Sequence, residues 1–210
     1  MWTRDWIVKV FVTVLGFFIC TASAMAGDDG RDGNDRRDGD GRVLPASAKP
    51  KGYSLSDIAA ATAAYNIDQS TPPPNVPFKI LVGDTTVKPD TMFYLPIFFA
   101  DDSTNPPAAP GFPTNISNRD ADADYLYSQA GVDAFIVQVD DKLTILDDDY
   151  VRGVKVALLP DGATHYIVSA AFLTPLTPGK HTVGIGGVID GGSDDDDEPV
   201  VFVSYDVTVR

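Results

Sequence analysis

The chain has 210 residues and a formal net charge of −14 at pH 7, from 30 acidic and 16 basic side chains. This length accommodates one domain with a sizeable core. The excess of negative charge argues against a nucleic-acid partner and against adhesion to anionic lipid, because both need clusters of Lys and Arg.

Residues 1–26 carry the three parts of a secretory signal peptide. Arg4 and Lys9 supply a positive start, Val10–Cys20 is an uncharged apolar run, and small residues follow. Cleavage after Ala24 and cleavage after Ala26 both fit this pattern. The apolar run is shorter than the roughly 20 residues of a spanning helix, so we expect no stable membrane insertion after cleavage. The sequence therefore predicts a secreted, periplasmic or cell-surface protein of bacterial type.

Two alternatives are an uncleaved membrane anchor and a lipoprotein modified at Cys20, although Phe18 and Ile19 are bulkier than the residues that usually precede a lipidated cysteine. Loss of Cys20 with the leader leaves no thiol, so the mature chain relies on core packing rather than on disulfides.

After residue 26 the chain has a single Glu and 28 Asp. Because Asp favours turns and caps, this usage is typical of a β protein with acidic loops.

Residues 27–51 are predicted to form a disordered Asp/Gly-rich spacer. Gly27–Arg42 contains only Gly, Asp, Arg and one Asn, so it has no apolar side chain to bury. Val43–Lys51 continues this spacer as a linker with two prolines, Pro45 and Pro50.

Two helices are expected. The first spans Tyr53–Tyr65, where Ser54 or Ser56 can cap the N-terminus and apolar residues recur at helical spacing. A second, shorter helix is expected over Asn118–Gln129, with Asn118 as its cap.

The other segments follow the period of two that is typical of strands. Pro96 places its strand at a sheet edge or a bulge, Asp140–Asp141 makes a tight turn, and the glycines of Gly184–Gly187 mark a bulge or a close approach. Strands are expected over Phe78–Val82, Phe93–Phe99, Phe135–Val139, Lys142–Leu146, Val151–Leu159, His165–Leu173, Lys180–Ile189 and Val201–Val209. This spacing predicts a mostly β fold: an antiparallel, immunoglobulin-like β-sandwich over residues 52–210, with one or two short helices.

The last two expected strands carry a resemblance to known proteins. Leu173–Val183 and Val203–Val209 resemble a hairpin of the form PLSPGxHTI and a final strand of the form TYxLTV in a group of uncharacterised secreted bacterial proteins. At the turn after Val139 and Asp140, Asp141 stands where that group often has Gly. Similar pieces also occur at Gly52–Ser54 and Leu95–Ile97. The resemblance implies a secreted β-sandwich and brings no known activity with it.

One acidic cluster resembles half of a calcium loop. Asp120, Asp122 and Asp124 have the alternating spacing that brings carboxylate oxygens to one ion. Tyr125 stands where an EF-hand needs Gly, and Gly131 stands where it needs Glu, so the segment is not an EF-hand. The alternative interpretation is an acidic helix start.

The densest acidic run lies between the last two expected strands and consists of Asp194, Asp195, Asp196 and Asp197, followed by Glu198. Like charges at this density favour a solvated loop. The competing hypothesis is that two or more acidic clusters meet at one end of the sandwich and bind calcium weakly. No other cofactor is expected.

No residue is predicted to be catalytic. His181 is expected to bond a neighbouring turn and His165 to lie at the surface, and the chain has no GxSxG elbow.

The predicted function is a non-enzymatic binding or structural module at or outside the cell surface, with an unknown extracellular or surface ligand. One alternative is a calcium-dependent carbohydrate-binding module, which needs exposed rings among Tyr94, Phe98, Tyr125, Tyr127, Tyr150 and Tyr166. Another is a secreted hydrolase that uses paired carboxylates.

Overall fold

The structure is a computed structural model that describes residues 40–103, 108–113, 115, 118–157, 159, 162–189 and 198–210. The chain divides into two compact units, Met1–Arg36 and Arg37–Arg210, and all described residues belong to the second. The predicted signal peptide and the part of the predicted spacer before residue 40 lie outside the described residues.

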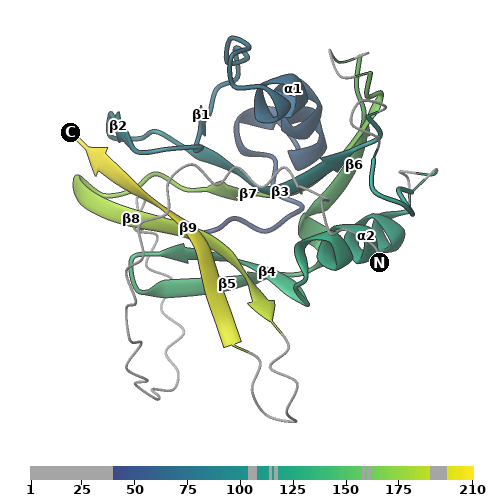
Figure 1. The fold of residues 1–210 in the computed structure, drawn as a ribbon. Coiled ribbons are helices and arrows are strands. Elements are labelled where there is room, and N and C mark those ends of the chain that lie inside the picture. Colours follow the sequence, from purple (N-terminus) through teal and green to yellow (C-terminus); the bar gives the residue numbers. More distant parts are fainter. Residues whose placement is uncertain are drawn as a thin grey trace. The chain divides into compact units, whose positions relative to one another are not determined.

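The described strands form two sheets (Figure 1). The four-stranded sheet has the order β1-β3-β7-β6, and the five-stranded sheet has the order β2-β9-β8-β4-β5. The first sheet comprises β1 (Lys79–Ile80), β3 (Phe93–Asp101), β7 (His165–Leu173) and β6 (Val151–Lys155). The second comprises β2 (Thr85–Val87), β9 (Glu198–Val209), β8 (Gly179–Ile189), β4 (Ala134–Val139) and β5 (Lys142–Leu146). The prediction of a mostly β fold is confirmed.

The prediction that all strands are antiparallel is wrong. β1 pairs with β3 in parallel, and β2 pairs with β9 in parallel, whereas the other strand pairs are antiparallel. The two parallel strands are consecutive along the chain, and each adds to the edge of a different sheet. Strands of two and three residues are too short to show a period in the sequence, which explains why β2 was not expected and β1 was expected to be longer.

Two α-helices accompany the sheets, as predicted. α1 (Leu55–Ile67) begins with a capping box in which Ser54 and Asp57 bond each other's backbone N–H groups. α2 (Arg119–Ala130) begins at Asn118, whose side chain accepts from the N–H of Ala121. Short 3-10 turns occur at η1 (Pro50–Gly52) and η2 (Asp148–Tyr150). No helix in the described ranges has the length and apolarity needed to cross a bilayer.

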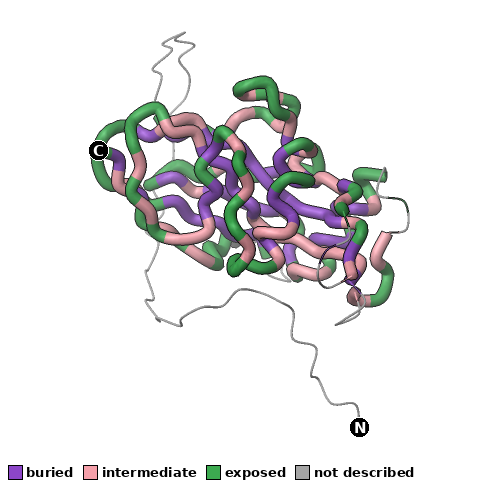
Figure 2. Tube along the Cα trace, turned by 90° about the horizontal axis from the view of Figure 1, so that it is seen from above, coloured by how far each residue is buried: buried purple, intermediate pink, exposed green. Residues whose placement is uncertain are grey.

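Two apolar clusters hold these layers together (Figure 2). The first lies between the sheets and includes Phe93 of β3, Phe135 of β4 and Leu126 of α2. The second lies between α1 and the outer face of the four-stranded sheet and includes Ile58 and Phe172. β3 and β7 are therefore buried on both faces along much of their length, as continuous apolar strands predict.

Residues 40–51 belong to the folded unit rather than to the spacer. Val43 is buried and forms a bridge with Leu173, and the N–H of Leu44 donates to the carbonyl of Phe172. Gly41 has φ +65°, and a Cβ there would lie 2.5 Å from Cδ2 of Leu176. Only glycine fits such a position without rearrangement. The domain therefore begins before residue 52, and composition missed this because short pairing segments carry few apolar residues.

Pro96 lies on β3 beyond Phe93 and Tyr94, the two residues that pair with β1, so β7 is its described partner strand. The pairing of β3 with β7 shifts register between Pro96 and Phe98. A bulge tolerates the missing N–H of proline. Of the two expected positions for Pro96, the bulge is confirmed.

Candidate functional site

One row of paired residues crosses the outer face of the five-stranded sheet and is apolar from end to end. Residues that pair directly across strands project on the same face of a sheet. The row runs from β5 through β4 and β8 to β9, as Ile145, Ile136, Gly186 and Val201, each paired with the next. Ile145 is 60% exposed and Val201 is 36% exposed, whereas Ile136 is buried. We call these four residues the apolar row.

Further apolar side chains are exposed on the same sheet. Among the described residues, every large exposed apolar side chain except Tyr53 belongs to β5, β8 or β9: Leu143, Ile145, Ile189, Val200, Val201 and Phe202. Single exposed apolar residues are ordinary, but a concentration on one sheet indicates an interaction surface. By strand pairing, Leu143, Ile145 and Val201 project on the outer face, whereas Val200 pairs with Gly187, which lies opposite Phe135, and projects on the core side. In Figure 1, α1 lies against the other sheet and α2 lies at one end of the strands, so neither helix lies across the outer face.

Two glycines shape the apolar row. A Cβ on Gly186 would lie 1.9 Å from the carbonyl oxygen of Val200, and a Cβ on Gly184 would lie 3.1 Å from Cγ1 of Val201. The pairing of β8 with β9 also shifts register between Ile185 and Gly186. The expected bulge and close approach are confirmed. The two glycines leave space for the backbone and side chains of β9 to lie close to β8.

A polar cluster joins the strands of the four-stranded sheet at Asp102 and His165. Oδ2 of Asp102 lies 2.6 Å from Nδ1 of His165, and Oδ1 accepts from the backbone N–H groups of Thr164 and His165 at 2.6 and 2.7 Å. Burial alone would raise the pKa of Asp102, but these hydrogen bonds outweigh it and lower the pKa to about 2. His165 lies partly exposed at the surface, as expected, and its carboxylate partner was not foreseen.

Asp102 orients the imidazole of His165, as the acidic residue of a catalytic triad orients its histidine. The hydroxyl of Thr164 lies 3.1 Å from Nδ1 of His165, the nitrogen that already faces Asp102, and 2.9 Å from the same carboxylate. A nucleophile relayed through His165 would instead have to approach Nε2. The described contacts therefore make this cluster a clamp between the end of β3 and the start of β7.

A second His–Asp pair joins the β4–β5 turn to β8. Nδ1 of His181 lies 2.9 Å from Oδ2 of Asp140, and Nε2 lies 2.9 Å from the carbonyl oxygen of Thr177. Burial alone would lower the pKa of His181, but Asp140 and the Thr177 carbonyl outweigh it and raise the pKa. The predicted bond from His181 to a neighbouring turn is confirmed, and its carboxylate partner was not foreseen.

The acidic cluster on α2 lies in the first turns of a helix. Asp120 and Asp124 are exposed, whereas Asp122 is buried with 1% of its surface accessible. Oδ1 of Asp122 has no hydrogen-bond partner among the described residues, and burial raises the pKa of Asp122 to about 6. The alternative interpretation, an acidic helix start after Asn118, is confirmed.

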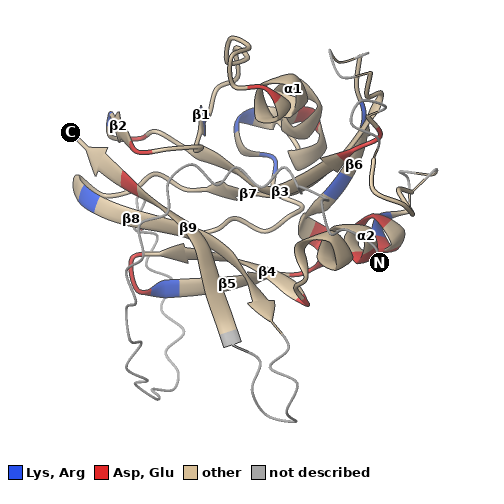
Figure 3. Cartoon of the chain, in the orientation of Figure 1, with Lys and Arg blue, Asp and Glu red and all other residues tan. Residues whose placement is uncertain are grey.

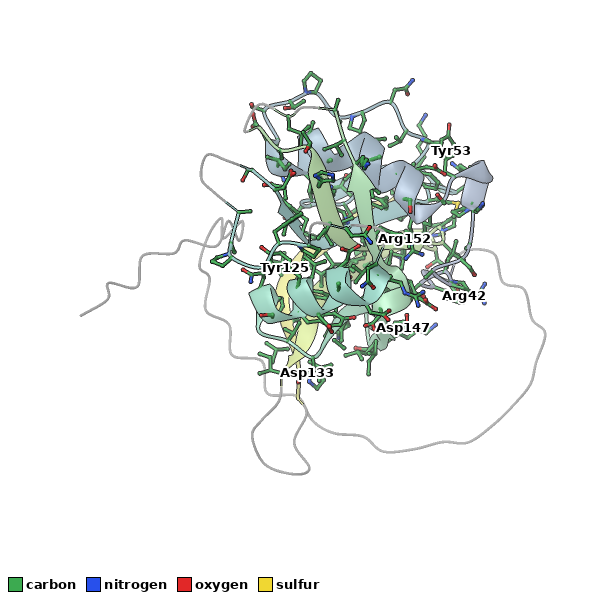
Figure 4. All side chains as sticks on the ribbon, turned by 90° about the vertical axis from the view of Figure 1, so that its right-hand side faces the viewer. Arg42, Tyr53, Tyr125, Asp133, Asp147 and Arg152 are labelled. Atoms are coloured by element: carbon green, nitrogen blue, oxygen red, sulfur yellow. The ribbon has the colours of Figure 1, made fainter. Side chains whose placement is uncertain are left out.

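Other charges gather where α2 meets η2. Arg119 pairs with Asp149, and the hydroxyl of Tyr127 donates to Oδ1 of Asp148. The guanidinium of Arg152 bonds the carbonyl oxygens of Val151 and Ala46. Figure 4 labels Arg152, Tyr125 and Asp147 around α2. The first two contacts hold η2 against α2, and the bond from Arg152 to Ala46 holds the N-terminal segment against β6.

The calcium hypothesis stays a prediction. Within the described ranges, no three His, Cys, Asp or Glu side chains come together in a group that could hold a metal ion. The other cluster of the hypothesis, Asp194 to Asp197, lies outside the described residues.

The six aromatic residues do not form one exposed face. Tyr94 and Tyr166 are fully buried in the cluster beneath α1, and Tyr125 is buried between the sheets. Most of these rings pack in the two clusters, so one sugar-stacking face built from all six does not form.

No protein-family model matches the chain, and neither a curated protein nor a solved structure matches it. The resemblance of the last two strands to secreted bacterial proteins therefore stays a prediction.

Proposed function

We propose that the chain is an exported, non-enzymatic binding module that acts at or outside the cell surface through the five-stranded sheet. The observation that carries this proposal is the concentration of exposed apolar side chains on β5, β8 and β9. Burying such side chains against a partner is favourable by roughly 25 cal/mol per Å² of apolar surface. A partner that covers the sheet would therefore stabilise both surfaces.

The contrast between the sheets supports this assignment. The outer face of the four-stranded sheet packs against α1 through Ile58, Ala59 and Ala63, which are completely buried. On the five-stranded sheet, Ile145 and Phe202 are 60% and 45% exposed. A monomer that needed both faces only for stability would place polar side chains at such positions.

Export belongs to the same proposal. It is supported by the three-part leader pattern of residues 1–26 and by the lack of cysteine after Cys20. The finer architecture is also a proposal: two packed sheets support an immunoglobulin-like arrangement, and the parallel pairs of β1 and β2 are a departure from it. The resemblance of the final hairpin to secreted bacterial proteins is consistent with both points.

Site-specific photo-crosslinking in the producing bacterium tests the binding role. A photoreactive phenylalanine analogue placed at Ile145 should give one dominant adduct, and the same group at Lys155, exposed on the four-stranded sheet, should not. Adducts of equal yield from both positions, or none from Ile145, would contradict the proposal. N-terminal sequencing of the product tests export: it should begin at Met25 or Gly27, and an intact leader on a cytosolic product would overturn that part.

A further inference from the structure

β5 is an edge strand whose outer backbone groups are open. It ends the order of the five-stranded sheet, and β4 is its only described strand partner. The N–H of Asp140 donates to the carbonyl of Thr182 on β8. Because backbone groups alternate in direction along a strand, the N–H groups of Val137 and Val139 then point towards β5. Their paired residues, Thr144 and Lys142, bond back. Leu143 and Ile145 therefore direct their N–H and C=O groups to the free edge.

The other edge strands of the two sheets are less open to a partner strand. β1 and β2 have only two and three residues. β6 lies against both helices, and its Arg152 bonds the carbonyl oxygen of Ala46 in the N-terminal segment. Among the described edges, β5 is a five-residue strand in which Leu143 and Ile145 combine free backbone groups with exposed apolar side chains.

Acidic side chains bracket β5 at both ends (Figure 3). Asp140 and Asp141 precede the strand, and Asp147, Asp148 and Asp149 follow it; all five are exposed. Lys142 is the one basic residue between positions 140 and 149, while Arg119 pairs with Asp149 and His181 pairs with Asp140. The edge therefore presents a short apolar centre with negative charge at each end, which Asp141 supplies before the strand and Asp147 and Asp148 supply after it.

This charge pattern disfavours a second copy as the occupant. The antiparallel self-pairing that overlaps all five residues of β5 is centred on Thr144, and it sets Leu143 of each copy opposite Ile145 of the other. That register sets Asp141 of each copy opposite Asp147 of the other. Like charges directly opposite each other destabilise strand pairing.

We propose that the β5 edge binds an extended, basic-flanked apolar segment of a partner protein, which adds to the five-stranded sheet as a further strand. Backbone bonds to Leu143 and Ile145 would supply affinity. Alternate apolar side chains of the segment would extend the apolar row, and Lys or Arg at its ends would face the Asp brackets. This inference rests on the proposed binding role and names the chemistry of the partner.

The probe is a fluorescent capped peptide in which lysine pairs flank five alternating valine and serine residues, titrated into the mature chain at low and at physiological salt. It should bind more weakly at the higher salt, because exposed charges are screened. The same peptide with glutamate in place of lysine should bind at least about tenfold more weakly. Equal affinity of the two peptides would overturn the proposal.

Two variants at Leu143 separate the contribution of the backbone N–H to peptide binding from that of the side chain. Leu143→Pro and Leu143→Ala both remove the side chain, but only proline removes the N–H that points to the edge, and it leaves the bonds to β4 intact. Leu143→Pro should abolish peptide binding, whereas Leu143→Ala should weaken it a few-fold. Equal affinities of the two folded variants would contradict strand addition.

Charge-reversal variants test the same inference if Leu143→Pro does not fold. Asp141→Lys should weaken the lysine-flanked peptide about fivefold or more, and Asp68→Lys, at the end of α1 in the opposite layer, should leave its affinity unchanged. Equal losses in both variants would overturn the inference. So would a stable dimer in sedimentation analysis that Leu143→Ala weakens, since a second copy would then occupy the edge. Crosslinks from Ile145 without binding of the lysine-flanked peptide would refute this inference and leave the binding role standing.

Discussion

The two sheets share one core but differ in what lies on their outer faces. α1 covers the four-stranded sheet with a second apolar cluster, so its central strands are buried on both sides. The five-stranded sheet carries exposed apolar side chains on β5, β8 and β9 instead. The same kind of side chain therefore stabilises the fold on one sheet and is available to a partner on the other.

Matched isoleucine substitutions should show this difference most strongly. Ile58→Ala, beneath α1, should lower the free energy of unfolding by about 2–5 kcal/mol, because it leaves a cavity at a fully buried position. Ile145→Ala should change it by less than about 0.5 kcal/mol. Chemical denaturation of both variants measures the pair. Equal losses would mean that the outer face of the five-stranded sheet is also core.

Matched glycine substitutions test the close approach of β9 within the five-stranded sheet. Gly186→Ala places a methyl group against the Val200 backbone and should cost about 1–3 kcal/mol. Gly184→Ala meets only the end of the Val201 side chain, which can shift, and should cost clearly less. Thermal melting of the two variants provides the comparison. A larger loss for Gly184→Ala than for Gly186→Ala would contradict the close approach of the Val200 backbone to Gly186.

Asp122 is a weak point beside the four-stranded sheet, where α2 packs. Its folded pKa, about 6, lies above the unfolded value of 3.8, so ionisation of Asp122 costs stability as the pH rises between these values. Asp122→Asn should therefore stabilise the protein by about 1–2 kcal/mol at pH 7.5, less than the full pKa difference implies, because the buried Asn amide also loses water. The gain should disappear near pH 3.8. A gain that is independent of pH would contradict a buried, ionisable Asp122.

The smallest effect should come from the His181–Asp140 pair beside β5. The folded pKa of His181 is raised above 6.5, so its contribution is present below that pH and is lost as the pH rises through the raised value. The folded pKa of Asp140 is lowered below 3.8, so its contribution is lost as the pH falls through the lowered value. Asp140→Asn should thus cost most between about pH 4 and 6.5, and less than about 1 kcal/mol because the carboxylate of Asp140 is exposed. Denaturation at pH 5.5 and 8.5 should show the larger loss at pH 5.5; the opposite order would exclude the ion pair.

Local signals in the sequence predicted the local structure. Ser54 and Asn118 cap the helices, Asp140–Asp141 turns the β4–β5 hairpin, and β7 spans His165–Leu173 as its apolar run predicted. Each of these features depends on residues within a few positions of each other.

The features that the sequence did not predict depend on distant residues. The Asp102–His165 clamp joins residues 63 positions apart, and the bridge from Val43 pairs it with Leu173. The apolar row likewise brings together residues of four strands through strand register. Such pairings follow from sheet topology, and a period of two along each strand says nothing of which strands become neighbours.

Amide hydrogen exchange in β5 of the free mature protein tests the central claim most directly. If the five-stranded sheet has a free edge, the N–H groups of Leu143 and Ile145 should exchange orders of magnitude faster than that of Thr144, which bonds β4. In β7, which has strands on both sides, the N–H groups of Ile167 and Val168 should both be protected. Protection of Leu143 and Ile145 equal to that of Thr144 would show that the edge is already occupied, and would contradict the account of β5 as an open binding edge.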